Sequence, residues 1–169
     1  RGCIGHNPLD TWVHIIGGGL SGLSLASSLA RHRVLPGPVL ISEPEPERLA
    51  EKTFSFWLTE EEYGFLNPEY AQPKWQVSAQ EINISRIGQR FRYGTRSGQH
   101  MLDEFQSVIA SHPQIHQVNE VINATPKAEH VFDSRPIAPS SFRMIQSFWG
   151  TEVEFQRPHQ IEAVGLMNR

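Results

Sequence analysis

Two short apolar runs near the N-terminus are separated by a segment whose apolar residues recur at helical spacing. The first run, Trp12 to Ile16, ends at glycine and is too short for a helix, so it predicts a buried strand. In Leu20 to His32 the apolar side chains share one helical face, and the segment ends at basic residues ahead of proline and glycine. The second run, Val39 to Glu43, predicts another strand. Strand, helix and strand in this order predict a βαβ unit with parallel strands and a right-handed crossover.

Beyond residue 52 the pattern changes to aromatic and β-branched residues with polar interruptions, which is typical of antiparallel strands. The stretches with this pattern are 53–58 and 74–96. Residues 99–111 carry apolar side chains at helical spacing and predict a second helix. Further strands are expected at 115–122, at 129–133 and at 142–155. The whole pattern predicts an α/β fold with an added antiparallel β region.

Gly17, Gly19 and Gly22 form the pattern G-x-G-x-x-G between the first strand and the helix. This is the context in which the pattern binds dinucleotides. The first glycine allows a tight turn, the second lets a pyrophosphate approach the backbone, and the third lets the helix pack on the sheet. Ala26, one turn after Gly22 on the same face, continues this close packing. The sequence therefore predicts a dinucleotide site, and the alternative is a structural glycine turn.

The helix N-terminus adds free N–H groups and a partial positive charge for phosphates. The candidate phosphate-binding residues are Gly17, Gly18, Gly19, Leu20, Ser21 and Gly22. Glu43, at the end of the second strand, is placed to accept hydrogen bonds from ribose hydroxyls. Arg48, in the charged loop that follows, can reach the adenosine half of a nucleotide. The alternative for Arg48 is an ordinary surface residue.

Composition narrows the possible functions. The net charge of −3, with 38% hydrophobic and 20% charged residues, is typical of a globular protein and gives no reason to expect nucleic acid as a partner. The single cysteine, Cys3, excludes a disulfide framework and favours a cytoplasmic setting. His112 and His116 are separated by helix-breaking Pro113, so no metal site is predicted. No apolar run reaches the roughly 18 residues of a spanning helix, so we expect contact with a membrane at most.

Later stretches resemble the lycopene cyclase family of flavoproteins. "TFSFW" (Thr53 to Trp57) is similar to the segment after the second strand in bacterial lycopene β-cyclases. "VFDSRP" (Val131 to Pro136) is similar to the family's V-x-D-x-R strand end. "QSFWGTEVE" (Gln146 to Glu154), with the terminal "GLMNR", resembles Q-x-F-x-G-x-x-V followed by Leu-Met-Asp. These stretches occur in the family's order over nearly the whole chain.

The chain also departs from the family pattern. Glu51 and Lys52 stand where the family usually has Asn-His, Phe54 stands in place of Trp, and Asn168 in place of Asp. Family members are also longer, and their proton-handling acidic segment lies in the second half. We therefore expect this chain to be a fragment of a family member, a chain with segments missing, or a degenerate relative, and no catalytic residue is assigned.

The resemblance implies a Rossmann-like FAD-binding core of the glutathione-reductase type, with an antiparallel β region on the substrate side. Residues 1–169 would form one such domain, with β insertions at 53–95 and 140–160. Asp133 would lie near the flavin, and the alternative is a loop cap. The candidates for an aromatic substrate lining, or for plain core packing, are Phe54, Phe56, Trp57 and Trp149.

The implied activity is the non-redox conversion of the linear ends of lycopene, or of a related carotenoid, to β-rings. Reduced FAD, with NADPH as its reductant, would be an electron-rich surface beside a carbocation, and a carboxylic acid would donate the proton. The substrate would be drawn from a membrane surface by a peripheral, cytoplasmic enzyme. Three alternatives remain open: an FAD-dependent monooxygenase, a prenyl-lipid reductase and a nucleotide-binding module without catalysis.

Overall fold

A computed structural model of the chain describes residues 11–79, 82–135, 156–157 and 164–168. The chain divides into two compact units, Arg1–Lys52 with Gly98–Ile137 and Thr53–Ser97 with Ala138–Arg169. The insertion predicted at 53–95 falls within the second unit. The strand predicted at 142–155 and the aromatic candidate Trp149 lie outside the described residues, as does the insertion at 140–160 apart from residues 156–157.

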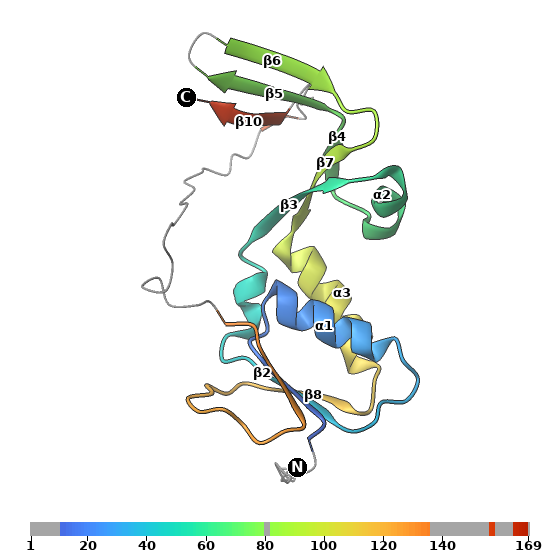
Figure 1. The fold of residues 1–169 in the computed structure, drawn as a ribbon, viewed down its shortest axis with the longest axis vertical. Helices are drawn as coiled ribbons and strands as arrows, with labels where there is room; N and C mark the ends of the chain where they lie inside the picture. The colour runs from blue at the N-terminus through green and yellow to red at the C-terminus, as the bar shows by residue number, and fades with distance from the viewer. Residues whose placement is uncertain (1–10, 80–81, 136–155, 158–163, 169) are drawn as a thin grey trace. The chain divides into compact units, whose positions relative to one another are not determined.

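The first unit contains a four-stranded parallel sheet with the strand order β8-β2-β1-β9 (Figure 1). Its strands are β1 (Val13–Ile16), β2 (Val39–Ser42), β8 (Ile115–Val118) and β9 (His130–Asp133). β1 pairs in parallel with β2 on one side and with β9 on the other, which confirms the predicted βαβ unit. The carboxyl ends of all these strands meet at one edge, where sheets of this type bind ligands.

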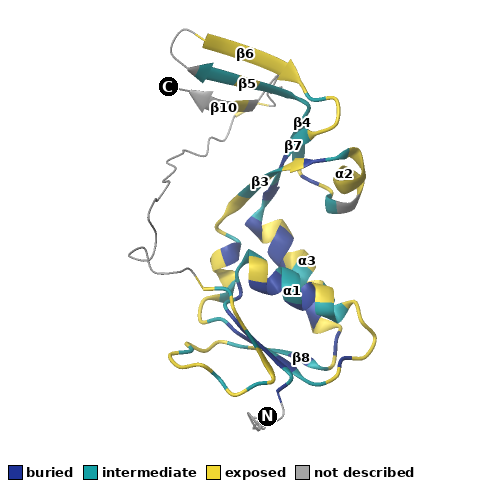
Figure 2. Ribbon diagram, in the orientation of Figure 1, coloured by how far each residue is buried: buried dark blue, intermediate teal, exposed yellow. Residues whose placement is uncertain are grey.

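Two helices pack together on this sheet. α1 (Leu20–Ala30) is the crossover from β1 to β2, and α3 (Gly98–Ala110) precedes β8 (Figure 1). Both predicted helices are confirmed, although α1 ends at Ala30 rather than His32. The core contains these buried apolar residues (Figure 2): Val13, Ile15, Leu23, Ala26, Val39, Ile41, Leu102 and Ile109. Their removal from water stabilises the unit and fixes α1 against β1.

One strand prediction is corrected in this unit. The strand expected at 115–122 ends at Val118, because pairing with β2 stops where β2 stops, at Ser42. Residues 119–129 then connect the two edge strands, β8 and β9, without regular structure. A short 3-10 helix, η1 (Pro46–Leu49), follows β2.

The second unit contains antiparallel strand pairs, as the sequence predicted. β3 pairs with β7 and β5 with β6 in antiparallel fashion, while β10 pairs with β5 in parallel. One sheet has the order β3-β7-β4 and the other β10-β5-β6. The strands are β3 (Thr53–Leu58), β4 (Tyr70–Gln72), β5 (Lys74–Ala79), β6 (Ile82–Ile87), β7 (Arg92–Ser97) and β10 (Val164–Asn168).

A short helix in the second unit, α2 (Glu60–Leu66), was not predicted. Thr59 caps it: the Thr59 hydroxyl accepts a hydrogen bond from the Glu62 N–H at 3.2 Å, and the Glu62 carboxylate accepts one from the Thr59 N–H at 2.8 Å. Asn67 ends it in the left-handed conformation, with φ of 43°. These local caps define a helix too short to appear in the apolar periodicity.

Two absences apply to the part of the chain that the structure describes. None of its helices has the length and apolar character needed to cross a membrane. It also contains no group of three or more His, Cys, Asp or Glu side chains arranged to hold a metal. His112 is instead buried, with Nε2 3.0 Å from the His32 carbonyl oxygen and Nδ1 accepting from the Gln114 N–H at 3.2 Å. These contacts join the segments that follow α1 and α3.

Candidate functional site

The glycine turn between β1 and α1 is shaped by contacts that exclude side chains. Gly17 has φ of 100°, a backbone conformation that favours glycine. A Cβ on Gly22 would overlap the carbonyl oxygen of Gly17, so α1 approaches the turn only because residue 22 lacks a side chain. Gly19 differs, because a Cβ there would meet no atom within 4 Å. The space beside Gly19 is open, as a backbone approached by a ligand requires.

Gly19 is also the N-cap of α1, and no side chain caps this end of the helix. The first N–H groups of a helix lack partners within the helix, and the helix dipole adds partial positive charge there. Leu20 and Ser21, the first residues of α1, line a cavity. This end of α1 is therefore suited to an anionic group.

Glu43 follows β2 and closes the turn from the other side. Its Oε2 accepts a hydrogen bond from the Gly18 N–H at 2.6 Å, and its Oε1 accepts one from the Glu45 N–H at 2.9 Å. A Cβ on Gly18 would lie 2.8 Å from Cβ and Cγ of Glu43, which explains a glycine that the sequence pattern does not require. A carboxylate has about four acceptor positions, so Glu43 is held in place with capacity left for hydroxyl donors.

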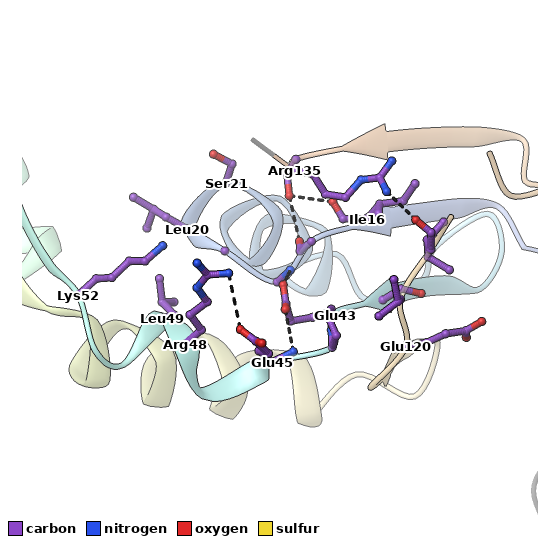
Figure 3. Close-up of a pocket in the computed structure, with 18 residues that line it drawn as sticks. Ile16, Leu20, Ser21, Glu43, Glu45, Arg48, Leu49, Lys52, Glu120 and Arg135 are labelled. Carbon is purple, nitrogen blue, oxygen red and sulfur yellow. Dashed lines mark hydrogen bonds and ion pairs between the residues drawn. The ribbon is translucent and has the colours of Figure 1, made fainter. Parts of the chain in front are cut away.

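A cavity of about 380 Å³ lies at the carboxyl edge of the parallel sheet (Figure 3). The predicted site residues in its lining are Gly17, Gly18, Gly19, Leu20, Ser21, Glu43 and Arg48. Gly22 and Asp133 are not in the lining. Gly22 packs against Gly17, and the carboxylate of Asp133 is bonded to Arg135. The structure therefore brings together most of the predicted site residues, from the segments that follow β1 and β2.

The lining also includes residues that were not predicted as site residues. Lys52 follows η1, Glu120 to Ile122 follow β8, and Ser134 and Arg135 follow β9. None of them belongs to the glycine motif, although Arg135 is the arginine of the V-x-D-x-R strand end. They share a position in the fold, because all of them lie in the segments that follow the carboxyl ends of the parallel strands β2, β8 and β9.

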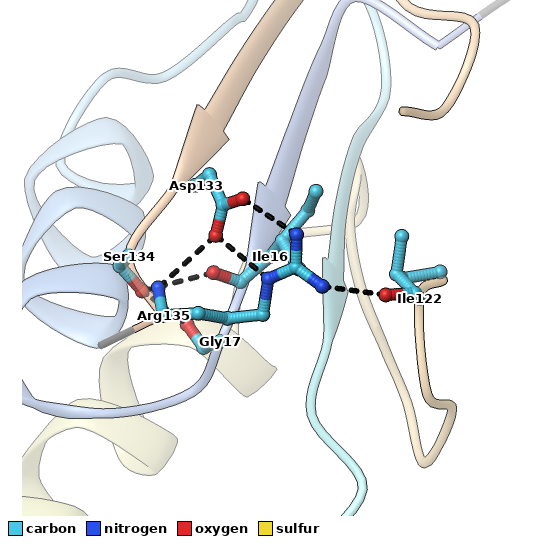
Figure 4. Close-up of polar contacts among 6 residues, drawn as sticks. All are labelled: Ile16, Gly17, Ile122, Asp133, Ser134 and Arg135. Atoms are coloured by element: carbon cyan, nitrogen blue, oxygen red, sulfur yellow. Dashed lines mark hydrogen bonds and ion pairs between the residues drawn. The ribbon is translucent and has the colours of Figure 1, made fainter. Parts of the chain in front are cut away.

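Ser134 supports the glycine turn from β9. Its N–H donates to the Ile16 carbonyl oxygen at 2.8 Å, and its hydroxyl lies 3.0 Å from the carbonyl oxygens of both Ile16 and Gly17 (Figure 4). A Cβ on Gly17 would lie 2.7 Å from Oγ of Ser134. The shape of the turn thus depends on a strand that is distant in the sequence.

Asp133 and Arg135 form a bidentate ion pair at the end of β9 (Figure 4). Nε of Arg135 donates to Oδ1 at 2.8 Å, and Nη2 donates to Oδ2 at 2.6 Å. The backbone N–H of Arg135 also donates to Oδ1, at 3.1 Å. These hydrogen bonds to the side chain and backbone of Arg135 lower the pKa of Asp133 from 3.8 to about 2. Asp133 is therefore ionised at neutral pH.

The aromatic residues of β3 are divided between the two faces of its sheet. Phe54 and Phe56 are half-buried and share one face, whereas Trp57 points to the other because side chains alternate along a strand. Trp57 is 44% exposed. Its ring contacts Trp75 and Tyr93 edge-on, at centroid distances of 6.4 and 5.1 Å. The three predicted lining residues of β3 therefore do not form one continuous surface.

Comparison with known proteins finds distant solved structures and a family model. A search of curated proteins finds no match. Two similar solved structures are both of PqsL from Pseudomonas aeruginosa: a mutant, at 15% identity and a TM-score of 0.49, and "a probable FAD-dependent monooxygenase", at 15% identity and a TM-score of 0.45. Each similarity covers 64% of this chain and 33% or 32% of PqsL, so the chain spans about a third of those structures.

The family comparison is more extensive, because residues 12–169 match the family model described as "Lycopene cyclase protein". This match includes the glycine turn, Glu43 and the strand end at Asp133. The chain therefore belongs to the lycopene cyclase family.

Proposed function

We propose that the cavity at the carboxyl edge of the parallel sheet binds FAD, as part of a lycopene cyclase. The observation that carries this proposal is the glycine turn, where open space at Gly19 adjoins the uncapped N-terminus of α1 and faces Glu43. A pyrophosphate requires close approach to backbone N–H groups, and a ribose requires a carboxylate acceptor. The two requirements are met in one cavity.

The charged side chains of the lining would complete the binding of the nucleotide. Arg48 is 3.6 Å from the Glu45 carboxylate, and both side chains are exposed, so a phosphate or ribose can compete for its guanidinium. Lys52, at a position where the family usually has His, extends toward the part of the cavity where α1 begins (Figure 3). Its ammonium group would attract the pyrophosphate.

The proposed reaction is the cyclisation of the linear ends of lycopene, or of a related carotenoid, to β-rings without net redox change. When bound, reduced FAD supplies an electron-rich surface beside a carbocation. The role of the first unit is to bind and orient the nucleotide. The bonds from Arg135 lower the pKa of Asp133 further below neutral pH, which makes it unsuited to donate a proton, so we assign the proton donor to a different acid.

We also propose NADPH as the reductant of the flavin and a peripheral position on the cytoplasmic face of a membrane. A hydrocarbon substrate resides in the bilayer, so the enzyme must reach it there. Contiguous exposed apolar surface marks such contacts, and the candidate in the second unit is the aromatic cluster of Trp57, at 44% exposure, with Trp75 and Tyr93.

Expression of the full-length protein in cells that accumulate lycopene tests the proposed function. We expect β-carotene or γ-carotene, with the hydrocarbon mass unchanged, and no product from Gly19→Val. Gly64→Val is the matched control, because a Cβ at Gly64 also meets no atom within 4 Å but lies in α2, outside the cavity.

Other products would contradict the proposal in different ways. An oxygenated carotenoid would indicate a monooxygenase, and a hydrogenated product would indicate a prenyl-lipid reductase. FAD binding without conversion of lycopene would indicate a nucleotide-binding module.

A further inference from the structure

One wall of the cavity is formed by a long connection that has no regular secondary structure. Residues 119–129 run from β8 at one edge of the parallel sheet to β9 at the other edge, and Glu120, Val121 and Ile122 line the cavity. They contain no helix or strand. At its ends the connection is held by backbone bonds from Glu120 to Val118 and from Glu129 to Thr11.

Arg135 holds the connection between those ends. Its Nη1 donates to the carbonyl oxygen of Ile122 at 2.6 Å, and among the described residues this is the hydrogen bond that ties residues 121–128 to the strand ends (Figure 4). Arg135 and Ile122 both belong to the cavity lining. The contact therefore joins two parts of the wall that come from opposite edges of the sheet.

Asp133 fixes the direction of the Arg135 guanidinium. Nε and Nη2 are both occupied by the Asp133 carboxylate, at 2.8 and 2.6 Å, which leaves Nη1 directed at Ile122. A planar guanidinium held at one side by a bidentate carboxylate presents its remaining N–H groups in fixed directions. A lysine ammonium lacks this planar fork and cannot reproduce all these contacts.

We propose that Arg135 is a positioning residue, which holds residues 120–122 in place as a preformed wall of the nucleotide cavity. The proposal rests on the proposed function, in which that nucleotide is FAD. A loop that is flexible in the free protein loses conformational entropy when a ligand orders it, and this loss weakens binding. A loop already held in its bound conformation avoids the loss. The side chains of Arg135 and Asp133 are 47% and 46% exposed, so their pair adds little to global stability. The effect of losing Arg135 should therefore be confined to the loop and to affinity.

Hydrogen exchange and FAD titration of the full-length protein test this role. In ligand-free Arg135→Ala we expect faster amide exchange in residues 119–129 than in wild type, and a dissociation constant for FAD about tenfold higher. Arg135→Lys should show both effects, and millimolar guanidinium should partly restore affinity in Arg135→Ala only. The matched control is Arg33→Ala, an exposed arginine outside the cavity lining, which should leave exchange and affinity unchanged.

The outcomes separate this inference from the function on which it rests. Unchanged exchange in residues 119–129 would overturn the positioning role, even if FAD affinity fell, because Arg135 would then contact FAD directly. If wild type bound no FAD, the proposed function would fail, and the exchange data would still decide whether Arg135 holds the loop. If Arg135→Ala did not fold, Asp133→Asn should loosen the same residues, because it removes the carboxylate that directs Arg135.

Discussion

Replacement of Glu43 tests the proposed recognition of the ribose at a single side chain. Its carboxylate is already oriented by the N–H groups of Gly18 and Glu45, at 2.6 and 2.9 Å. We expect Glu43→Ala to weaken FAD binding by about 1–3 kcal/mol, because the carboxylate that would accept charge-assisted hydrogen bonds from the ribose hydroxyls is lost. Fluorescence titration of the flavin measures this change. Glu47→Ala, in η1 and outside the cavity lining, should bind FAD like wild type, and equal affinity in both variants would contradict the assignment.

A second prediction at the residue scale concerns the pH dependence of Asp133. Its pKa in the folded protein is lowered from 3.8 to about 2 by hydrogen bonds from Arg135. A lowered pKa means that the ionised form is favoured by folding, so the contribution of this pair is complete above pH 4 and is lost as the pH falls toward 2. Carboxyl chemical shifts should report a pKa of about 2 in wild type and a value returning toward 3.8 in Arg135→Ala. A wild-type value near 3.8 would mean that the pair does not form in solution.

At the scale of elements, the close approach of α1 to the glycine turn depends on Gly22. A Cβ at Gly22 would overlap the Gly17 carbonyl oxygen, which is backbone and cannot rotate away. We expect Gly22→Ala to lower the free energy of unfolding by about 1–3 kcal/mol, as overpacking does. Urea denaturation measures it. Gly64→Ala, where the Cβ is unobstructed, should not destabilise the protein, and similar stability in the two variants would contradict the packing described for α1.

The elements also show what could be predicted from the sequence. The pairing of β1 with β2 and the position of α1 were predictable, because the βαβ unit is local and its periodicity is clear. α2 was missed because caps at Thr59 and Asn67, rather than periodicity, define it. Within the candidate site, the glycines and Glu43 follow from a motif. Arg135 belongs to the V-x-D-x-R strand end, but its contact to Ile122 and the contact of Ser134 to Gly17 could not be predicted, because they depend on how β9 pairs with β1.

At the scale of the whole molecule, the described cavity is built from the first unit alone. The proposed nucleotide binding therefore depends on the parallel sheet and its carboxyl edge, and it can be tested apart from the proposed cyclisation. The central claim is that this edge holds FAD, with the pyrophosphate next to Gly19. The family match over residues 12–169 gives the claim its context, and the open space at Gly19 gives it a single residue to test.

The most direct test is a titration of the purified full-length protein with FAD, for wild type and Gly19→Val, with thermal unfolding of both. The backbone of Gly19, at φ −75° and ψ −173°, is extended and accepts valine, and no protein atom lies within 4 Å of the added Cβ. We predict saturable binding by wild type and loss of binding in Gly19→Val, with an unfolding temperature only slightly lowered, because valine is a poorer N-cap residue than glycine. Absence of binding by wild type, or equal affinity in the two proteins, would contradict the account.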